Sequence, residues 1–97
     1  MRTYELIFIA HPNLDEEGLQ GLVDHVRDVV TEADGNIIDV DHMGRRQLAY
    51  PIRNRWEGYY VLVQADLEPA TVTEVEHELN LREDILRYLL VRREEEE

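Results

Sequence analysis

All ten basic side chains of this 97-residue chain are arginines, and most of them fall in two stretches. The first stretch holds Arg45, Arg46, Arg53 and Arg55, and the second holds Arg82, Arg87, Arg92 and Arg93. A guanidinium forks two hydrogen bonds onto a phosphate and keeps its charge at neutral pH. Because the chain otherwise carries 22 acidic residues, these groups predict a localised binding surface rather than a general coat for polyanions. The alternative is that they only neutralise neighbouring carboxylates.

The other residue types that carry chemistry are absent or badly spaced for catalysis. There is no cysteine, which excludes a disulfide framework, a thiolate zinc site and a cysteine nucleophile. The histidines lack zinc-like spacing, and the acidic groups lack the glycine and alternating ligands of a calcium loop. No phosphate loop, nucleophile elbow or glycine-rich nucleotide turn is present. The sequence therefore predicts a non-enzymatic protein with no catalytic residue, metal or cofactor.

Hydrophobic periodicity predicts the elements that position the arginines. Residues 3–10 are largely apolar on both faces, which is typical of a central strand. Apolar residues at helical spacing over 19–33 predict an amphipathic helix. We expect Asn13 to cap its start, with Glu16 completing a capping box. We expect Gly35 to end it in the left-handed conformation.

The second half of the chain repeats this pattern. A strand is predicted from residue 36 to residue 52, with a bulge at Gly44 and a sheet-edge position because Pro51 has no amide donor. Residues 54–58 are interpreted as a hairpin loop, and residues 59–65 as a β-prone strand. A second helix begins at Pro69 and closes near Asn80, and a last strand covers 85–91. The predicted helices carry nearly all the acidic residues, so we expect an acidic helical face toward solvent and arginine-bearing strand ends toward a binding partner.

The order strand–helix–strand, twice, predicts an α+β ferredoxin-like split βαβ sandwich. Its four-stranded antiparallel sheet has the order 4-1-3-2, and both helices cover one face. We expect one domain over residues 1–93, followed by an acidic, disordered tail at 94–97.

Alternation places Tyr60 and Leu62, with Ile7 and Ile9, on the sheet face away from the helices. An apolar open face is a candidate docking surface, and the alternative is cross-strand support of the sheet. Tyr50 and Trp56 flank the hairpin arginines, where they either stack on a partner or anchor the hairpin. The candidate partner-binding residues are therefore Tyr50, Arg53, Trp56, Tyr60 and Leu62.

Several motifs resemble one family. These are the start Met1–Glu5, Pro12-Asn13-Leu14, the run Arg45-Arg46-Gln47-Leu48-Ala49-Tyr50-Pro51-Ile52, Gly58-Tyr59-Tyr60, and Leu86–Val91. In order and spacing they resemble bacterial small-subunit (30S) ribosomal protein six. The Leu-Ala-Tyr-Pro-Ile core after a basic pair is the most specific of them. The complete absence of lysine and the marked acidity depart from the family's usual composition.

The resemblance implies a structural constituent of the small ribosomal subunit. It implies binding to the central domain of small-subunit ribosomal RNA together with small-subunit ribosomal protein eighteen. The candidate RNA-binding residues are Arg2, Arg45, Arg46, Arg82, Arg87 and Arg92. The alternative function is a ferredoxin-like ligand-binding or oligomerising module.

Composition adds three expectations. The formal net charge of −12 costs stability through self-repulsion, which salt would relieve. A salt-rich cytoplasm would explain both the acidity and the use of arginine without lysine. Codon composition would explain the absence of lysine equally well. The chain shows neither a signal peptide nor the roughly 20 apolar residues of a membrane span, so we expect a cytoplasmic protein with no membrane partner, monomeric when free.

Overall fold

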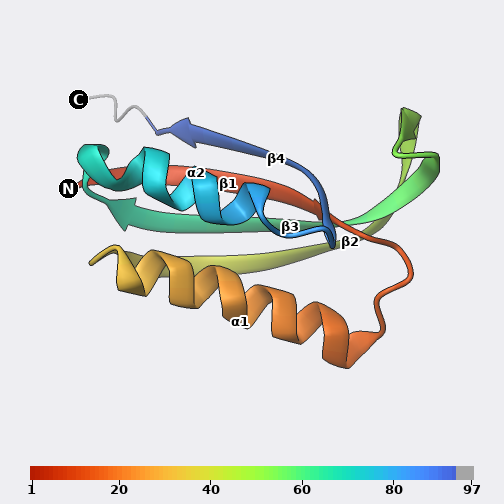
Figure 1. Ribbon diagram of the computed structural model, residues 1–97, viewed down its shortest axis with the longest axis horizontal. Coiled ribbons are helices and arrows are strands. Elements are labelled where there is room, and N and C mark those ends of the chain that lie inside the picture. Colours follow the sequence, from red (N-terminus) through yellow and green to blue (C-terminus); the bar gives the residue numbers. More distant parts are fainter. Residues whose placement is uncertain (94–97) are drawn as a thin grey trace.

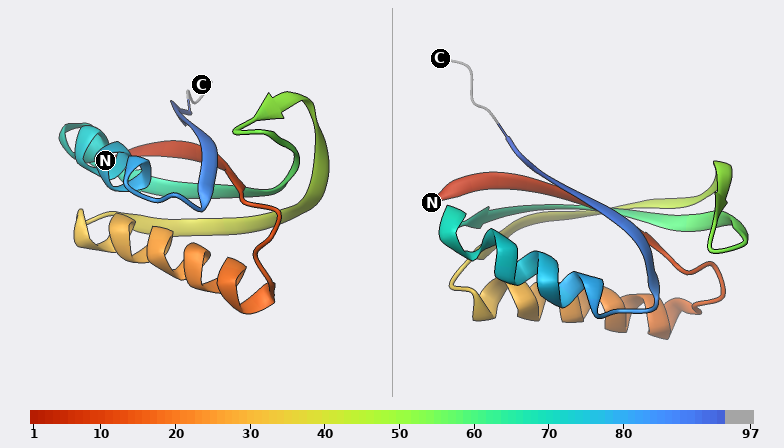
Figure 2. Two further views of the ribbon diagram at one scale, coloured as in Figure 1. Left: turned by 45° about the vertical axis from the view of Figure 1, so that its right-hand side comes forward. Right: turned by 45° about the horizontal axis from the view of Figure 1, so that its top comes forward.

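The computed structural model describes residues 1–93, so the acidic tail expected at 94–97 lies outside the described residues. Its elements are, in chain order, β1 (Arg2–Ala10), α1 (Glu16–Glu32), β2 (Asn36–Ile52), β3 (Arg55–Leu67), a 3₁₀ turn (Pro69–Thr71), α2 (Val72–Asn80) and β4 (Ile85–Arg92). The four strands pair antiparallel in the order β2-β3-β1-β4. Both helices cover the same face of the sheet (Figures 1 and 2). This confirms the predicted ferredoxin-like sandwich.

The main core lies between the sheet and the two helices. Alternate residues of β1 and β3 point into it, and Phe8 pairs with Val61 across the two strands, both fully buried. Leu22, Val26 and Val30 of α1 pack against these strand residues from the helical layer. No helix within residues 1–93 is long and apolar enough to cross a membrane.

The start of α1 differs from the prediction. The N-cap is Asp15, whose Oδ1 accepts the backbone N–H of Gly18 at 2.7 Å, and not Asn13. Asn13 instead lies in a preceding turn, where its own N–H donates to His11 Nδ1 at 3.1 Å. The capping side chain therefore comes two residues later than the Asn-x-x-Glu pattern indicated.

The end of α1 also differs in one residue. Asp34, with a φ of 61°, takes the left-handed conformation that was expected of Gly35. Gly35 is needed for close packing, since a Cβ there would lie 2.7 Å from the carbonyl oxygen of Asp66 and from Leu67 Cδ2. Asp tolerates the left-handed region better than most residues with a side chain.

β2 is an edge strand, as Pro51 predicted, and the register shifts beside Gly44, whose φ is 93°. The predicted loop at 54–58 is wrong. The chain reverses at Arg53 and Asn54, both at positive φ, and Ile52 pairs with Arg55. Two consecutive residues at positive φ match the right-handed twist of the flanking strands, so β3 begins immediately after the turn.

The β2–β3 hairpin bends away from the helices at its tip and curls over the open face of the sheet (Figures 1 and 2). Beneath it lies a second hydrophobic cluster of Ile9, Leu48 and Leu86, against which Ile52 and Tyr60 pack. The open face is therefore not uniformly exposed: Ile9 lies on it, as the alternation predicted, but is buried beneath the hairpin. The bend exists because burying these side chains removes apolar surface from water.

Candidate nucleic-acid interface

The strand register divides the candidate arginines between two ends of the molecule. Arg46 pairs with Gly58, and Arg87 pairs with Ile9, so both lie near the hairpin end of the sheet. Arg92 pairs with Tyr4 at the opposite end, beside Arg2. The five residue steps along β4 from Arg87 to Arg92 span roughly 17 Å. The group expected around the last strand is therefore split, and Arg82 and Arg87 belong with the hairpin.

Arg45 ties the hairpin to the body of the domain. Its Nη1 donates to Glu57 Oε1 at 2.9 Å, and its Nη2 donates to the carbonyl oxygen of Pro12 at 3.0 Å. The first contact is an ion pair across β2 and β3, and the second reaches the loop between β1 and α1. Arg45 thus neutralises a neighbouring carboxylate, which was the alternative interpretation of these arginines, and its bond to Pro12 was not predicted.

Arg82 is engaged in the same way, by the carboxylate two residues later. Its Nε and Nη2 donate to the two oxygens of Asp84 at 3.0 and 2.8 Å. This hydrogen bond lowers the pKa of Asp84 and raises that of Arg82, against a smaller opposing effect of burial. The Asp84 carbonyl in turn accepts the N–H of His11 at 2.8 Å, which fixes the loop before β4.

Arg46 and Arg87 lie over aromatic rings instead. The Arg46 guanidinium carbon is 5.9 Å from the centre of the Tyr60 ring, and that of Arg87 is 5.6 Å from the Tyr50 ring. Arg87 also donates from Nη1 to Tyr50 Oη, which anchors the hairpin onto β4. Within residues 1–93 neither guanidinium has a carboxylate within 4.0 Å, so both keep uncompensated charge.

The remaining candidates of the hairpin lie at its tip. Arg53 donates from Nη1 to the backbone carbonyl of Glu83 at 3.2 Å, and so joins the turn to the loop before β4. Trp56 is 62% exposed and Tyr50 is 55% exposed. Trp56 is therefore accessible to a partner, whereas the Tyr50 ring and hydroxyl already contact Arg87 and leave only part of the ring accessible.

An apolar strip crosses the open face between the two cationic ends. Ile7 pairs with Leu62 on one side and with Leu89 on the other, so the three side chains form one row. Leu89 is 58% exposed, and Val91, two residues further along β4, is also exposed. Leu62 thus lies where the alternation predicted, whereas Leu89 and Val91 were not among the candidates.

The acidic residues are less segregated than expected. The exposed side of α1 carries Glu16, Glu17, Asp24, Asp28 and Glu32. Five acidic residues nevertheless lie on strands, namely Glu5, Asp39, Asp41, Glu57 and Asp66. The prediction that helices carry nearly all the acids is therefore wrong, since acids also flank the apolar strip on the open face. The hairpin end remains the most cationic part of the sheet.

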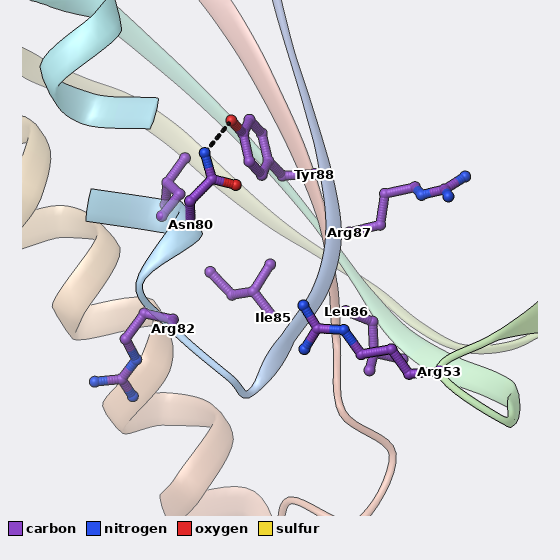
Figure 3. Close-up of a pocket in the computed structure, with 8 residues that line it drawn as sticks. Arg53, Asn80, Arg82, Ile85, Leu86, Arg87 and Tyr88 are labelled. Carbon is purple, nitrogen blue, oxygen red and sulfur yellow. Dashed lines mark hydrogen bonds between the residues drawn. The ribbon is translucent and has the colours of Figure 1, made fainter. Parts of the chain in front are cut away.

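A hollow of about 220 Å³ lies between the end of α2 and β4. Figure 3 shows Asn80, Ile85 and Tyr88 around it, with Arg53 directing its guanidinium toward Ile85. Asn80 donates from Nδ2 to Tyr88 Oη at 3.2 Å. No group of three or more metal-ligating side chains occurs within the described part of the chain.

A family model described as ribosomal protein S6 matches residues 3–92. The chain belongs to the ribosomal protein S6 family. It is 38% identical over 96 residues to small ribosomal subunit protein bS6 of Moorella thermoacetica, covering 99% of this chain and 98% of the relative. It is 44% identical over 90 residues to bS6 of Bifidobacterium longum, covering 93% of each. The crystal structure of 30S ribosomal protein S6 from Thermotoga maritima superposes with a TM-score of 0.90 at 33% identity, covering 95% of this chain and 87% of that one.

Membership in the S6 family confirms the resemblance drawn from the Arg45–Ile52 run. It makes the protein a structural, non-enzymatic component of the small ribosomal subunit, which in bacteria is cytoplasmic. The solved relative has the same two-layer fold.

Proposed function

We propose that the protein binds the central domain of small-subunit ribosomal RNA together with small-subunit ribosomal protein eighteen. The observation that carries this proposal is the pair Arg46 and Arg87 at the hairpin end of the sheet. Both are exposed cations held over tyrosine rings and, within residues 1–93, free of any carboxylate within 4.0 Å. In a chain of net charge −12, such uncompensated cations are the natural contacts for phosphate.

The engaged arginines have a second part in this proposal. Arg45 donates two hydrogen bonds to Glu57 and Pro12, and Arg82 donates two to Asp84. They position the hairpin and the loop before β4, so that the free cations stay in place. Arg2 and Arg92 provide phosphate contacts at the other end. Phosphate contacts fix the register of the RNA without reading its sequence.

The apolar row of Ile7, Leu62 and Leu89 is the proposed docking surface for protein eighteen. Leu89 is more than half exposed, although burying a leucine contributes about 1.5–3 kcal/mol. Tyr50, Arg53, Trp56 and Tyr60 border this surface from the hairpin. Because partner and RNA would touch neighbouring surfaces, each raises the effective concentration of the other. We expect the free protein to be monomeric, which light scattering would check.

The test replaces Arg46 by alanine and measures the affinity of the protein, mixed with protein eighteen, for a central-domain RNA fragment over a series of salt concentrations. One lost phosphate contact reduces the slope of log K against log salt by about 0.9 or less. Arg27 is the matched control, because it is an exposed arginine on the acidic face of α1. Arg27→Ala should leave affinity and slope unchanged. If wild-type protein and partner fail to bind the fragment, the proposed function is wrong.

A further inference from the structure

We propose that the hollow between α2 and β4 receives one unstacked base of ribosomal RNA. This inference rests on the proposed function and adds a base-recognition site to its phosphate contacts. RNA proteins read sequence mainly from bases that are splayed out of the helix and hydrogen-bonded along their edges. A site of this kind needs an apolar floor, polar groups at one wall and a cation for the adjoining phosphate. The hollow has all three.

The size and the floor suit a single base. The volume of about 220 Å³ is below the roughly 300 Å³ at which pockets for drug-sized molecules begin, so the hollow admits a fragment and not a whole cofactor. Leu79, Ile85 and Leu86 line it, and all three are buried side chains of the cores. The apolar floor is small, because these three side chains are almost fully buried. Hydrogen bonds to the edge of the base must therefore carry most of the recognition.

The polar wall is the pair Asn80 and Tyr88. Their one hydrogen bond uses an N–H of Asn80 and a lone pair of the Tyr88 hydroxyl. The Asn80 carbonyl oxygen, its second N–H and the Tyr88 O–H stay available. These are two donors and one acceptor at the mouth of the hollow, a set that matches the mixed donor and acceptor edge of a base. Asn80 is exposed at the end of α2, so a base reaches it without displacing the chain.

The cation is Arg53. Its Nη1 is used by the Glu83 carbonyl, and its guanidinium points toward the hollow in Figure 3, with four further N–H donors. Arg87 lines the other side and points outward (Figure 3), where the adjoining backbone of the RNA would run. Arg82, whose Nε and Nη2 are taken by Asp84, shapes the wall and is not a phosphate ligand here.

The test uses the double variant Asn80→Leu, Tyr88→Phe. It removes the polar wall, keeps the aromatic ring and leaves every arginine in place. With protein eighteen and the central-domain RNA fragment, we expect affinity to fall about tenfold at every salt concentration, since paired hydrogen bonds to one base discriminate by about that factor or more. The salt slope should not change, because it counts phosphates. The single variant Tyr88→Phe should give a smaller loss in the same direction, and urea denaturation confirms that each variant is folded.

The matched control is Gln20→Leu, Tyr59→Phe. It removes one amide and one phenol hydroxyl from the hollow beside α1, at a distance from the proposed site, and should leave affinity unchanged. If wild type binds RNA and the Asn80, Tyr88 variant binds equally well, the base site is wrong and the proposed function stands. A reduced salt slope in that variant would also overturn the base site, in favour of a phosphate contact. If wild type does not bind the RNA, both proposals fail.

Discussion

Gly58 allows the hairpin to lie against the sheet, and its replacement by alanine tests this packing. A Cβ at Gly58 would lie 2.3 Å from Ile9 Cγ2 and 3.3 Å from the carbonyl oxygen of Ala10. Ile9 belongs to the cluster with Leu48 and Leu86, so it has little room to move. We therefore expect the clash in Gly58→Ala to cost about 1–3 kcal/mol, the usual cost of overpacking a core.

A gain in chain entropy opposes this cost. Gly58 is not at positive φ, so alanine fits its backbone and would by itself stabilise the protein by about 0.4–1 kcal/mol. The net loss should then lie between about 0 and about 2.6 kcal/mol, the difference of the two ranges, in a urea titration at constant m. Gly21→Ala is the control, because nothing lies within 4 Å of its Cβ position. In the middle of α1 it should stabilise by about 1 kcal/mol.

The clash has a specific partner, so a double-mutant cycle isolates it. Ile9→Leu removes the branched Cγ2 methyl and keeps the volume, at a cost of less than about 1.5 kcal/mol alone. In combination with Gly58→Ala it should recover most of the loss, which gives a favourable coupling energy. If the two losses simply add, the contact between Gly58 and Ile9 does not explain the glycine.

Two further predictions concern charge. The free energy of unfolding should rise as salt is raised from about 0.01 M to about 1 M, because the net charge of −12 is then screened. Over this range the Debye length falls from about 30 Å to about 3 Å. A urea midpoint that does not change with salt would contradict this self-repulsion. Asp84→Asn should lower stability by up to about 1 kcal/mol at neutral pH, since both partners are partly exposed. Because Arg82 lowers the pKa of Asp84, this contribution is present above the ordinary aspartate pKa of about 3.9 and is lost as pH falls through the lower folded value. Wild type and variant should therefore converge in acid urea titrations, and a gap that stays constant down to about pH 2 would show that the loss is not due to the charge of Asp84.

Much of the fold could be predicted because hydrophobic periodicity is a local property of the sequence. The alternation of β1 and β3 and the stripe of α1 specify which faces are buried, and the crossover rule then orders the strands. The N-cap of α1 could not be predicted from such a pattern, because Asn13 and Asp15 are both good caps. The choice depends on a turn in which Leu14 N–H donates to the His11 carbonyl, while His11 N–H donates to the Asp84 carbonyl. That second bond joins residues distant in sequence.

The sequence showed which arginines cluster near the hairpin, but not which groups they contact. The pair Arg45–Glu57 depends on the register of β2 against β3, in which Arg45 faces Tyr59 and Gln47 faces Glu57. This makes Arg45 and Glu57 diagonal neighbours on one face of the sheet. A hairpin loop at 54–58 would have removed Glu57 from the ladder, so the wrong turn also concealed the ion pair. The tight turn that keeps Glu57 in the ladder depends on two residues at positive φ, Arg53 and Asn54.

The contacts also bear on why every cation is an arginine. Arg45 reaches a carboxylate and a carbonyl with two nitrogens, and Arg82 forks onto both oxygens of Asp84. Arg87 covers the Tyr50 ring while donating to its hydroxyl. A lysine is a compact point charge and would lose one contact in each case.

Four other arginines show whether contact geometry or codon composition explains the absence of lysine. Within residues 1–93, the side chains of Arg2, Arg27, Arg55 and Arg92 make no hydrogen bond, ion pair or ring contact with their own chain. Charge alone does not distinguish arginine from lysine at these sites. Arginine is therefore required by geometry where it ties the hairpin together. At the other four positions, the choice of arginine over lysine must come either from a bidentate external ligand or from the codon composition of the gene. Arg27 favours codon composition, because it lies on the acidic face of α1.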